Sequence, residues 1–307
     1  MTSWSSLRAE AEHELVASGV PASVAPLEAR FLIEHVSGAD RGELASMGSD
    51  PAPARGVNEL DRLLARRGAG EPLQYVIGSW SFRGIDLFVD RRVLIPRPET
   101  EITAEIALEM ALKGSARRGR PDPWSARNDD RDDWIAVDLG TGSGALALAL
   151  VVELPDAVVW ATDVSRDALA VARANIAGTG TTRVRLAEGS WYRALDDELR
   201  NRVRLIVANP PYVAQSELAG LAREIVDHEP REALVSGPTG LEAIEAVVAE
   251  APSWLASDGA VVCELAPHQA EAATTVAETA GFADVEVRRD LTGRPRVLVA
   301  RRAGVQR

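Results

Sequence analysis

The spacing of apolar residues divides the chain into two regions with different periods. Up to about residue 70, apolar side chains recur every three or four positions, as at Leu7, Ala11 and Leu15. From Trp134 onward, short apolar runs alternate with segments of helical period. The first pattern predicts a small helical bundle. The second predicts an α/β domain with a mostly parallel sheet covered on both faces.

The second region contains seven segments with the composition of strands. They are residues 135–137, 158–162, 184–186, 205–208, 260–265, 284–289 and 296–300. Helices are predicted at residues 102–112, 145–153, 166–176, 216–225, 240–255 and 267–280. This alternation is typical of a Rossmann-like sheet of seven strands.

A different pattern connects the two regions. Residues 71–99 alternate apolar and polar positions around Gly78 and Gly84, which predicts a β-hairpin. The hairpin ends in a proline-rich run, after which Thr100 is expected to cap a helix. We therefore expect a helical bundle at 1–70 that recognises substrate, a hairpin linker at 71–100 and a catalytic domain at 101–307. Within that domain, the polar residues 114–133 are expected to form a flexible surface insertion.

Composition narrows the class of protein. The formal net charge is −12, which argues against unspecific binding to a nucleic acid backbone. The single cysteine, Cys263, excludes an internal disulfide and a cysteine metal cluster. No apolar run is long enough to span a bilayer, and the amphipathic, acidic N-terminus does not resemble a targeting signal. We expect a cytoplasmic protein without a membrane partner.

A glycine-rich turn follows the first predicted strand of the catalytic domain. Residues 138–144 read DLGTGSG, and glycines at this spacing allow a turn to pass close to a ligand. The motif lacks the Walker lysine, so it is not a P-loop. By itself it is a weak signal, since a tight strand–helix turn also needs glycine. Asp163 ends the next strand, where a carboxylate can bind two ribose hydroxyls. Together they suit an adenosine ligand without an anchored phosphate.

Trp191 follows the third predicted strand. A ring at a strand end can stack on an adenine, although a tryptophan of the domain core is an equally good interpretation.

Residues 205–212 read LIVANPPY and combine a buried strand with a stiff polar loop. The strand must end at Asn209, because Pro210 and Pro211 have no N–H group and have a fixed φ angle. The Asn209 side chain and the Pro210 carbonyl offer hydrogen-bond acceptors, and Tyr212 offers an aromatic face. Such a loop suits a planar amine or amide, without distinguishing between the two.

The order of the glycine turn, Asp163 and NPPY resembles that of class I methyltransferases that use S-adenosyl-L-methionine. Longer segments are similar to the HemK/PrmC family, which methylates the N5 amide of a glutamine in class I peptide chain release factors. They are residues 71–101, 137–150, 209–212, 228–244 and 290–297. The most specific are VLIPRPETE and NPPY. A related family that methylates a ribosomal protein varies in the PRPETE segment, which is intact here.

The resemblance implies a role for each matching residue. Catalysis would involve Asn209, Pro210 and Tyr212, and the substrate glutamine would bind to Asn209, Pro210, Pro211 and Tyr212. The cofactor would bind to Gly140, Thr141, Gly142, Ser143, Gly144, Asp163, Trp191 and Asn209, and no metal is implied. One departure is Ser190, which stands where an aspartate is common in the family.

Three other functions remain open from the residues. An adenine-N6 methyltransferase of DNA or RNA could use the same loop, although the net charge of −12 counts against it. A glutamine methyltransferase acting on a ribosomal protein is a second alternative, and a regulatory module that binds cofactor without catalysis is the third. We expect a monomer whose partners are release factors, with no direct nucleic acid contact.

Overall fold

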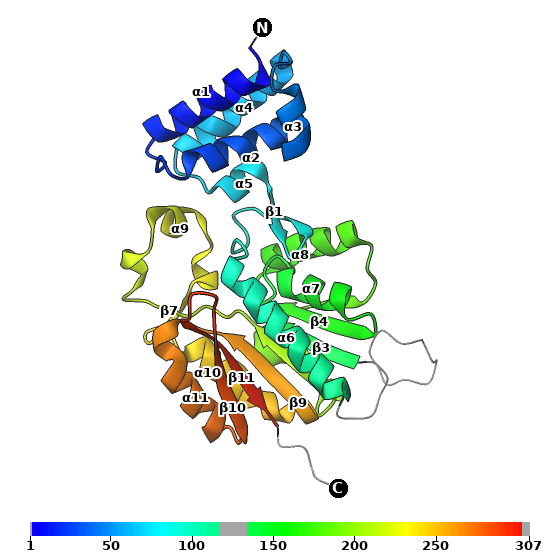
Figure 1. Ribbon diagram of the computed structural model, residues 1–307. Coiled ribbons are helices and arrows are strands. Elements are labelled where there is room, and N and C mark those ends of the chain that lie inside the picture. Colours follow the sequence, from blue (N-terminus) through cyan, green and yellow to red (C-terminus); the bar gives the residue numbers. More distant parts are fainter. Residues whose placement is uncertain (1, 117–133, 303–307) are drawn as a thin grey trace. The chain divides into compact units, whose positions relative to one another are not determined.

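The computed structural model describes residues 2–116 and 134–302, and the chain forms two compact units (Figure 1). The first unit comprises residues 1–79 together with 222–228. The second comprises residues 80–221 and 229–307.

The first unit is a helical bundle. Its helices are α1 (Trp4–Ala17), α2 (Ala25–Ser37), α3 (Arg41–Met47), α4 (Ala54–Gly68), α5 (Leu73–Ile77) and α9 (Arg223–His228). Local signals set several of the ends. Ser3 caps α1, Gly38 ends α2 in a left-handed conformation, and Asp40 and Glu43 form a capping box on α3. The predicted apolar face of α1, with Leu7, Ala11 and Leu15, is buried in the core.

A buried ion pair joins three helices of this unit. Arg67 of α4 donates two hydrogen bonds to Glu28 of α2, at 2.7 and 3.0 Å. Its guanidinium also lies 3.4 Å from the carboxylate of Glu224 in α9. Arg67 therefore bridges α4 to α2 and also contacts α9, which lies far along the chain.

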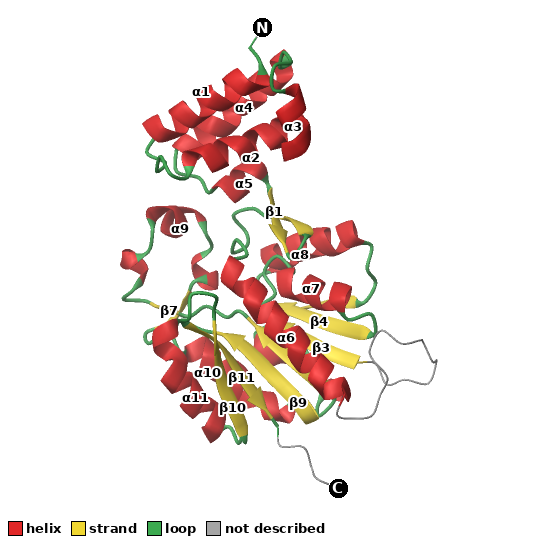
Figure 2. Cartoon of the chain, in the orientation of Figure 1, coloured by secondary structure: helices red, strands yellow, loops and turns green. Residues whose placement is uncertain are grey.

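The second unit is built on the predicted seven-stranded sheet, which is confirmed (Figure 2). Its strands are β3 (Trp134–Leu139), β4 (Ala157–Asp163), β5 (Val184–Glu188), β6 (Val203–Ala208), β9 (Leu255–Glu264), β10 (Asp284–Arg289) and β11 (Pro295–Arg301). Their order is β10-β11-β9-β6-β3-β4-β5. In this sheet only β11 is antiparallel to its neighbours, so the centre of the sheet is parallel.

Helices cover both faces of this sheet. Alternate residues of a strand point to opposite faces, so apolar side chains on both faces pack against helices. The helices are α6 (Pro98–Ala116), α7 (Ala145–Glu153), α8 (Arg166–Thr179), α10 (Glu242–Glu250) and α11 (Ala270–Thr279). On β9, Cys263 packs in the core shared with α10 and α11. The next residue, Glu264, points to the opposite face and accepts a hydrogen bond from Thr103 of α6. One strand end thus contributes to both layers.

The hairpin is shorter than predicted. Residues 73–77 form helix α5, because Pro72 precedes its first turn and Gly78 ends it in a left-handed conformation. The hairpin itself is β1 (Ser79–Phe82) and β2 (Ile85–Phe88). Asn175 of α8 holds β2 by bonding both the N–H and the carbonyl of Phe88, at 2.7 and 3.0 Å. The proline-rich run that follows is therefore attached to the sheet domain.

The predicted helix cap at Thr100 is wrong. Helix α6 begins two residues earlier, at Pro98, where the fixed φ angle and missing N–H of proline suit a first helical position. The Thr100 side chain is instead turned inward toward Asn209. At the other end, α6 runs to Ala116, and the rest of the predicted insertion lies outside the described residues.

The predicted helix at 216–225 is also wrong. A 3₁₀ turn (Leu218–Gly220) is followed by the short helix α9. Two short strands flank this segment in the sequence and pair in parallel with each other. They are β7 (Val213–Ala214) and β8 (Val235–Gly237). The predicted helix 240–255 ends early because β9 already begins at Leu255. These segments are too short for a period to be recognised.

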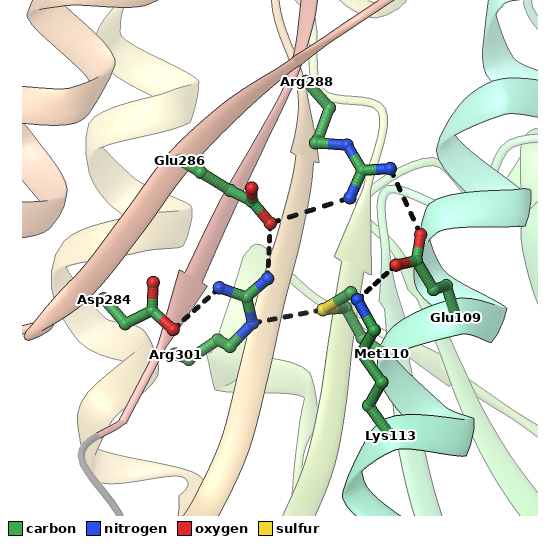
Figure 3. Close-up of polar contacts among 7 residues, drawn as sticks. All are labelled: Glu109, Met110, Lys113, Asp284, Glu286, Arg288 and Arg301. Carbon is green, nitrogen blue, oxygen red and sulfur yellow. Dashed lines mark hydrogen bonds and ion pairs between the residues drawn. The ribbon is translucent and has the colours of Figure 1, made fainter.

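Ion pairs connect α6 to the outer strands of the sheet (Figure 3). Arg301 of β11 bonds Asp284 of β10 at 2.8 Å and also pairs with Glu286. Arg288 of β10 reaches Glu109 of α6 at 3.3 Å. Such partly exposed pairs each contribute little to the stability of the fold.

Across residues 2–116 and 134–302, none of the helices is both long enough and apolar enough to cross a bilayer.

Candidate active site

The carboxyl ends of the central strands meet at one edge of the sheet. Leu139 of β3 lies opposite both Thr162 of β4 and Ala208 of β6, and Ala208 lies opposite Cys263 of β9. The residues that follow these positions are Gly140, Asp163, Asn209 and Glu264. This register brings together residues that are far apart in sequence, at the edge where parallel sheets place their ligands.

The glycine turn is held against the end of β4. The N–H groups of Gly140 and Thr141 both donate to the Thr162 carbonyl, at 2.9 and 2.8 Å. Gly140 has a φ of +76°, and a side chain there would lie 3.5 Å from the ring of Trp191. The positive φ angle therefore favours glycine in this turn, and the ring of Trp191 packs beside it.

Asp163 is fixed by backbone donors. Its two carboxylate oxygens accept hydrogen bonds from the N–H groups of Ser165 and Gly142, both at 2.9 Å. Burial raises the pKa of this carboxyl, and the backbone hydrogen bonds oppose the rise. The carboxylate is thus oriented before any ligand binds, and each oxygen keeps a free lone pair.

Trp191 has a strained backbone. Its φ angle is +49°, a left-handed conformation that is unfavourable for residues with a side chain. The next residue, Tyr192, supplies the restraint. It is buried, donates a 2.6 Å hydrogen bond to the Val247 carbonyl and stacks on Trp254. Strain of this kind is typical of functional sites.

A cavity of about 230 Å³ opens at this edge of the sheet. Of the residues predicted to bind cofactor or substrate, the following line it: Gly140, Thr141, Gly142, Ser143, Asp163, Trp191, Asn209 and Pro211. Gly144, Pro210 and Tyr212 are not among the lining residues. Gly144 instead precedes α7 in a left-handed conformation with a φ of +86°, which favours glycine at this position.

The NPPY loop is anchored at both ends. At its start, the Asn209 amide donates a 3.1 Å hydrogen bond from Nδ2 to Oγ1 of Thr100. At its end, the Tyr212 carbonyl accepts a 2.9 Å hydrogen bond from Nε2 of Gln269. The same Nε2 also donates to the Gly240 carbonyl at 3.0 Å. Gln269 therefore ties the loop to the segment before α10.

The Tyr212 hydroxyl stays protonated at neutral pH. Burial raises the pKa of this phenol to about 12, and the nearby carboxylate of Glu264 acts in the same direction. Tyr212 therefore cannot serve as a general base.

Glu264 is a buried carboxyl beneath the loop. Burial raises its pKa to about 7, while the hydroxyl groups of Thr100 and Thr103 and the charge of Arg296 lower it. Glu99 adds a repulsive charge. Thr103 donates a hydrogen bond to Oε2 at 3.0 Å, and Oε1 has no hydrogen-bond partner among the described residues.

Several lining or supporting residues were not singled out from the sequence. Arg92, Thr100 and Glu232 line the cavity. Arg97 forms an ion pair with the buried carboxylate of Glu229, which also accepts a hydrogen bond from the N–H of Ile95 at 3.3 Å. These contacts connect the PRPETE run (residues 96–101) with the HEPREAL run (residues 228–234). Both runs lie within the segments that carry the family resemblance, but the sequence did not show that they pair.

The chain resembles known proteins in both units. Residues 6–78 match the family model of the PrmC N-terminal domain, and residues 128–239 match the methyltransferase small domain. The release factor glutamine methyltransferase of Bordetella pertussis is 41% identical over 271 residues, which cover 88% of this chain and 93% of that protein. The protein of the same name from Deinococcus radiodurans is 38% identical over 302 residues, or 97% and 98% of the two chains.

A solved structure supports the fold alone. A methyltransferase from Pyrococcus furiosus superposes with a TM-score of 0.50 at 19% identity and covers 81% of this chain and 99% of that one.

Proposed function

Because the chain belongs to the release factor glutamine methyltransferase family, we propose that it methylates the side-chain amide nitrogen (N5) of a glutamine in a peptide chain release factor. The observation that carries the proposal is the meeting of Asp163, Trp191 and Asn209 in one cavity at the edge of the sheet. A donor site and an acceptor site for the methyl group are then adjacent.

The residues of the cavity suit S-adenosyl-L-methionine. Asp163 offers two oriented carboxylate oxygens for the ribose hydroxyls, and the ring of Trp191 lies beside Gly140, where an adenine can stack. Ser190 also lines the cavity and would replace the carboxylate that is common before the tryptophan. When bound, the cofactor supplies a methyl group on a positively charged sulfur.

The NPPY loop orients the substrate amide. An amide nitrogen is a weak nucleophile, because its lone pair is delocalised into the carbonyl group. Oδ1 of Asn209 and the carbonyl of Pro210 would accept its two N–H groups, which holds the nitrogen in position and raises its electron density. The contact of Tyr212 with the amide plane stays a prediction, since its side chain is not among those that line the cavity.

A methylation assay tests the proposal directly. The protein is incubated with isotopically labelled S-adenosylmethionine and either a release factor, a ribosomal protein fraction or nucleic acid, and the methyl group is located by mass spectrometry. Label on a release factor glutamine is the expected outcome. Label on adenine or on a ribosomal protein would support the alternative substrates, and no transfer at all would support a regulatory module.

Asp163 should control cofactor affinity. Replacing it with alanine removes two charge-assisted hydrogen bonds to the ribose, at about 1.5 kcal/mol each, so we expect the Kd of S-adenosylmethionine to rise by roughly 100-fold. The matched control is Asp167→Ala, an exposed aspartate in the first turn of α8. Calorimetry that gives the same Kd for both variants would exclude the ribose role.

The helical unit is proposed to bind the body of the release factor, since one glutamine offers little surface for recognition. Among the described residues of this unit, four large apolar side chains are exposed, namely Val16, Val24, Leu27 and Val226. Leu27 is 47% exposed, and Leu27→Asp should raise the KM for the release factor by about tenfold, or ~1.4 kcal/mol. The control is Val152→Asp, at a 52% exposed valine of α7. Equal KM values in the two variants would argue that Leu27 is not part of the binding surface.

The remaining expectations follow from this function. A substrate used in translation fits a cytoplasmic location, and a monomer that binds no nucleic acid stays our prediction.

A further inference from the structure

Thr100 and Asn209 are 109 residues apart in sequence and are joined by one hydrogen bond. Nδ2 of Asn209 donates to Oγ1 of Thr100 at 3.1 Å. Thr100 lies in the first turn of α6, is only 3% exposed and lines the same cavity as Asn209. The asparagine that faces the reacting nitrogen is thus in contact with a buried hydroxyl from another element.

The direction of this hydrogen bond follows from the groups below it. A threonine hydroxyl has one hydrogen to donate and two lone pairs, whereas an ionised carboxylate can only accept. The hydroxyl of Thr100 lowers the pKa of the buried Glu264 carboxyl, whose Oε1 has no hydrogen-bond partner among the described residues. A hydroxyl hydrogen turned toward this carboxyl leaves Oγ1 of Thr100 as an acceptor, in agreement with the observed hydrogen bond from Nδ2 of Asn209.

The two ends of an asparagine amide have nearly the same shape, so packing does not distinguish them. With Nδ2 turned to Thr100, Oδ1 points away from Thr100. With the amide reversed, two N–H donors would face a substrate that presents N–H donors of its own, and the substrate amide could not be held.

We propose that Thr100, oriented by the buried carboxylate of Glu264, is a positioning residue that fixes the Asn209 amide with its oxygen toward the methyl-accepting nitrogen. This inference rests on the proposed function of the NPPY loop. It explains why a carboxylate is buried beneath that loop, where its desolvation is unfavourable. It also gives a chemical reason for a threonine in the PRPETE run.

The test compares two valine substitutions on one helix. Thr100→Val keeps the shape of the side chain but removes the acceptor for Asn209. Thr103→Val is the matched control, because Thr103 is 0% exposed and also bonds Glu264, at 3.0 Å, but has no hydrogen bond to Asn209. Thr100→Ser restores the hydroxyl. All variants are assayed as full-length protein with intact release factor at about pH 8.5, above the pKa of Glu264.

We expect Thr100→Val to lower kcat by about 30- to 100-fold, while the Kd of S-adenosylmethionine changes less than about threefold. Thr103→Val should keep kcat within about threefold of the wild type, and Thr100→Ser should recover most of the lost activity. Equal losses of kcat in the two valine variants would overturn the proposal, because a packing defect would then explain both.

A second variant is used if Thr100→Val does not fold. Glu264→Gln keeps the volume of the side chain but introduces N–H donors that compete for Oγ1 of Thr100, so kcat should fall by about tenfold or more. An unchanged kcat in Glu264→Gln would also contradict the proposal. Wild-type protein that transfers no methyl group to the release factor would instead refute the proposed function, so the two failures are distinguishable.

Discussion

Replacement of Asn209 by alanine should lower kcat at least 1000-fold while leaving cofactor affinity nearly unchanged. The side chain is proposed to supply a preorganised acceptor to the substrate amide, and the loss of one such group from a water-excluded site typically lowers the rate about 100- to 1000-fold. Here the substitution also removes the hydrogen bond from Nδ2 of Asn209 to Oγ1 of Thr100. We therefore expect a value at the upper end of that range or beyond.

The measurement is a single-turnover assay with saturating release factor, together with calorimetry of S-adenosylmethionine binding. Asp163→Ala serves as the converse variant, because it should weaken cofactor binding and retain transfer at saturating cofactor. A variant without Asn209 that still methylates at close to the wild-type rate would show that the loop has another role. Equal losses of affinity and rate in both variants would show that the two sites are not separable.

Much of the fold could be predicted from the sequence. The strands β3, β4 and β6 each contain an uninterrupted apolar run, because both faces of a parallel sheet are buried. β3 is followed by Gly140, and β6 is followed by Asn209 and two prolines, residue types that are unfavourable within a strand. These strand ends also located the candidate site, since the carboxyl ends of parallel strands lie at one edge of the sheet.

The support of the site could not be predicted in this way. Thr100 follows a proline-rich run and looks like a helix cap, yet proline at the first position lets α6 begin earlier and turns Thr100 inward. Glu264 is a single acidic residue after an apolar run, with no period that marks its side as facing α6. Gln269 acts through backbone carbonyls, which carry no signal in the sequence.

The different roles of two glycines in the predicted turn could not be predicted from the sequence either. Gly140 and Gly144 belong to one motif and both have positive φ angles. Only the tertiary structure shows that Gly140 lies beside the Trp191 ring and lines the cavity, whereas Gly144 lies beside Ala172 of α8 and does not line it. A spacing pattern can indicate that glycine is favoured, but it does not show which glycine faces the ligand site.

Gly240→Ala should impair both folding and catalysis. Gly240 has a φ of +83°, and a Cβ atom there would lie 2.8 Å from the carbonyl oxygen of Tyr212 and 3.0 Å from the N–H nitrogen of Ala214. Because both neighbours are backbone atoms, the NPPY loop itself must move. Left-handed strain and this displacement should lower the free energy of unfolding by about 3 kcal/mol. Since a shift of about 1 Å at a catalytic group can reduce the rate 100-fold, kcat should fall by about that factor.

The matched control is Gly281→Ala, which separates strain from contact. Gly281 has a similar φ of +90°, but a Cβ atom there would meet no atom within 4 Å. It should therefore lose about 1 kcal/mol of stability from the backbone conformation and keep the wild-type kcat. Urea unfolding and the methylation assay are run on both variants. If Gly240→Ala retains the wild-type kcat, then the position of the loop does not depend on its close approach to Gly240 and Gln269, and the orientation of Asn209 must rest on Thr100 and the two prolines alone.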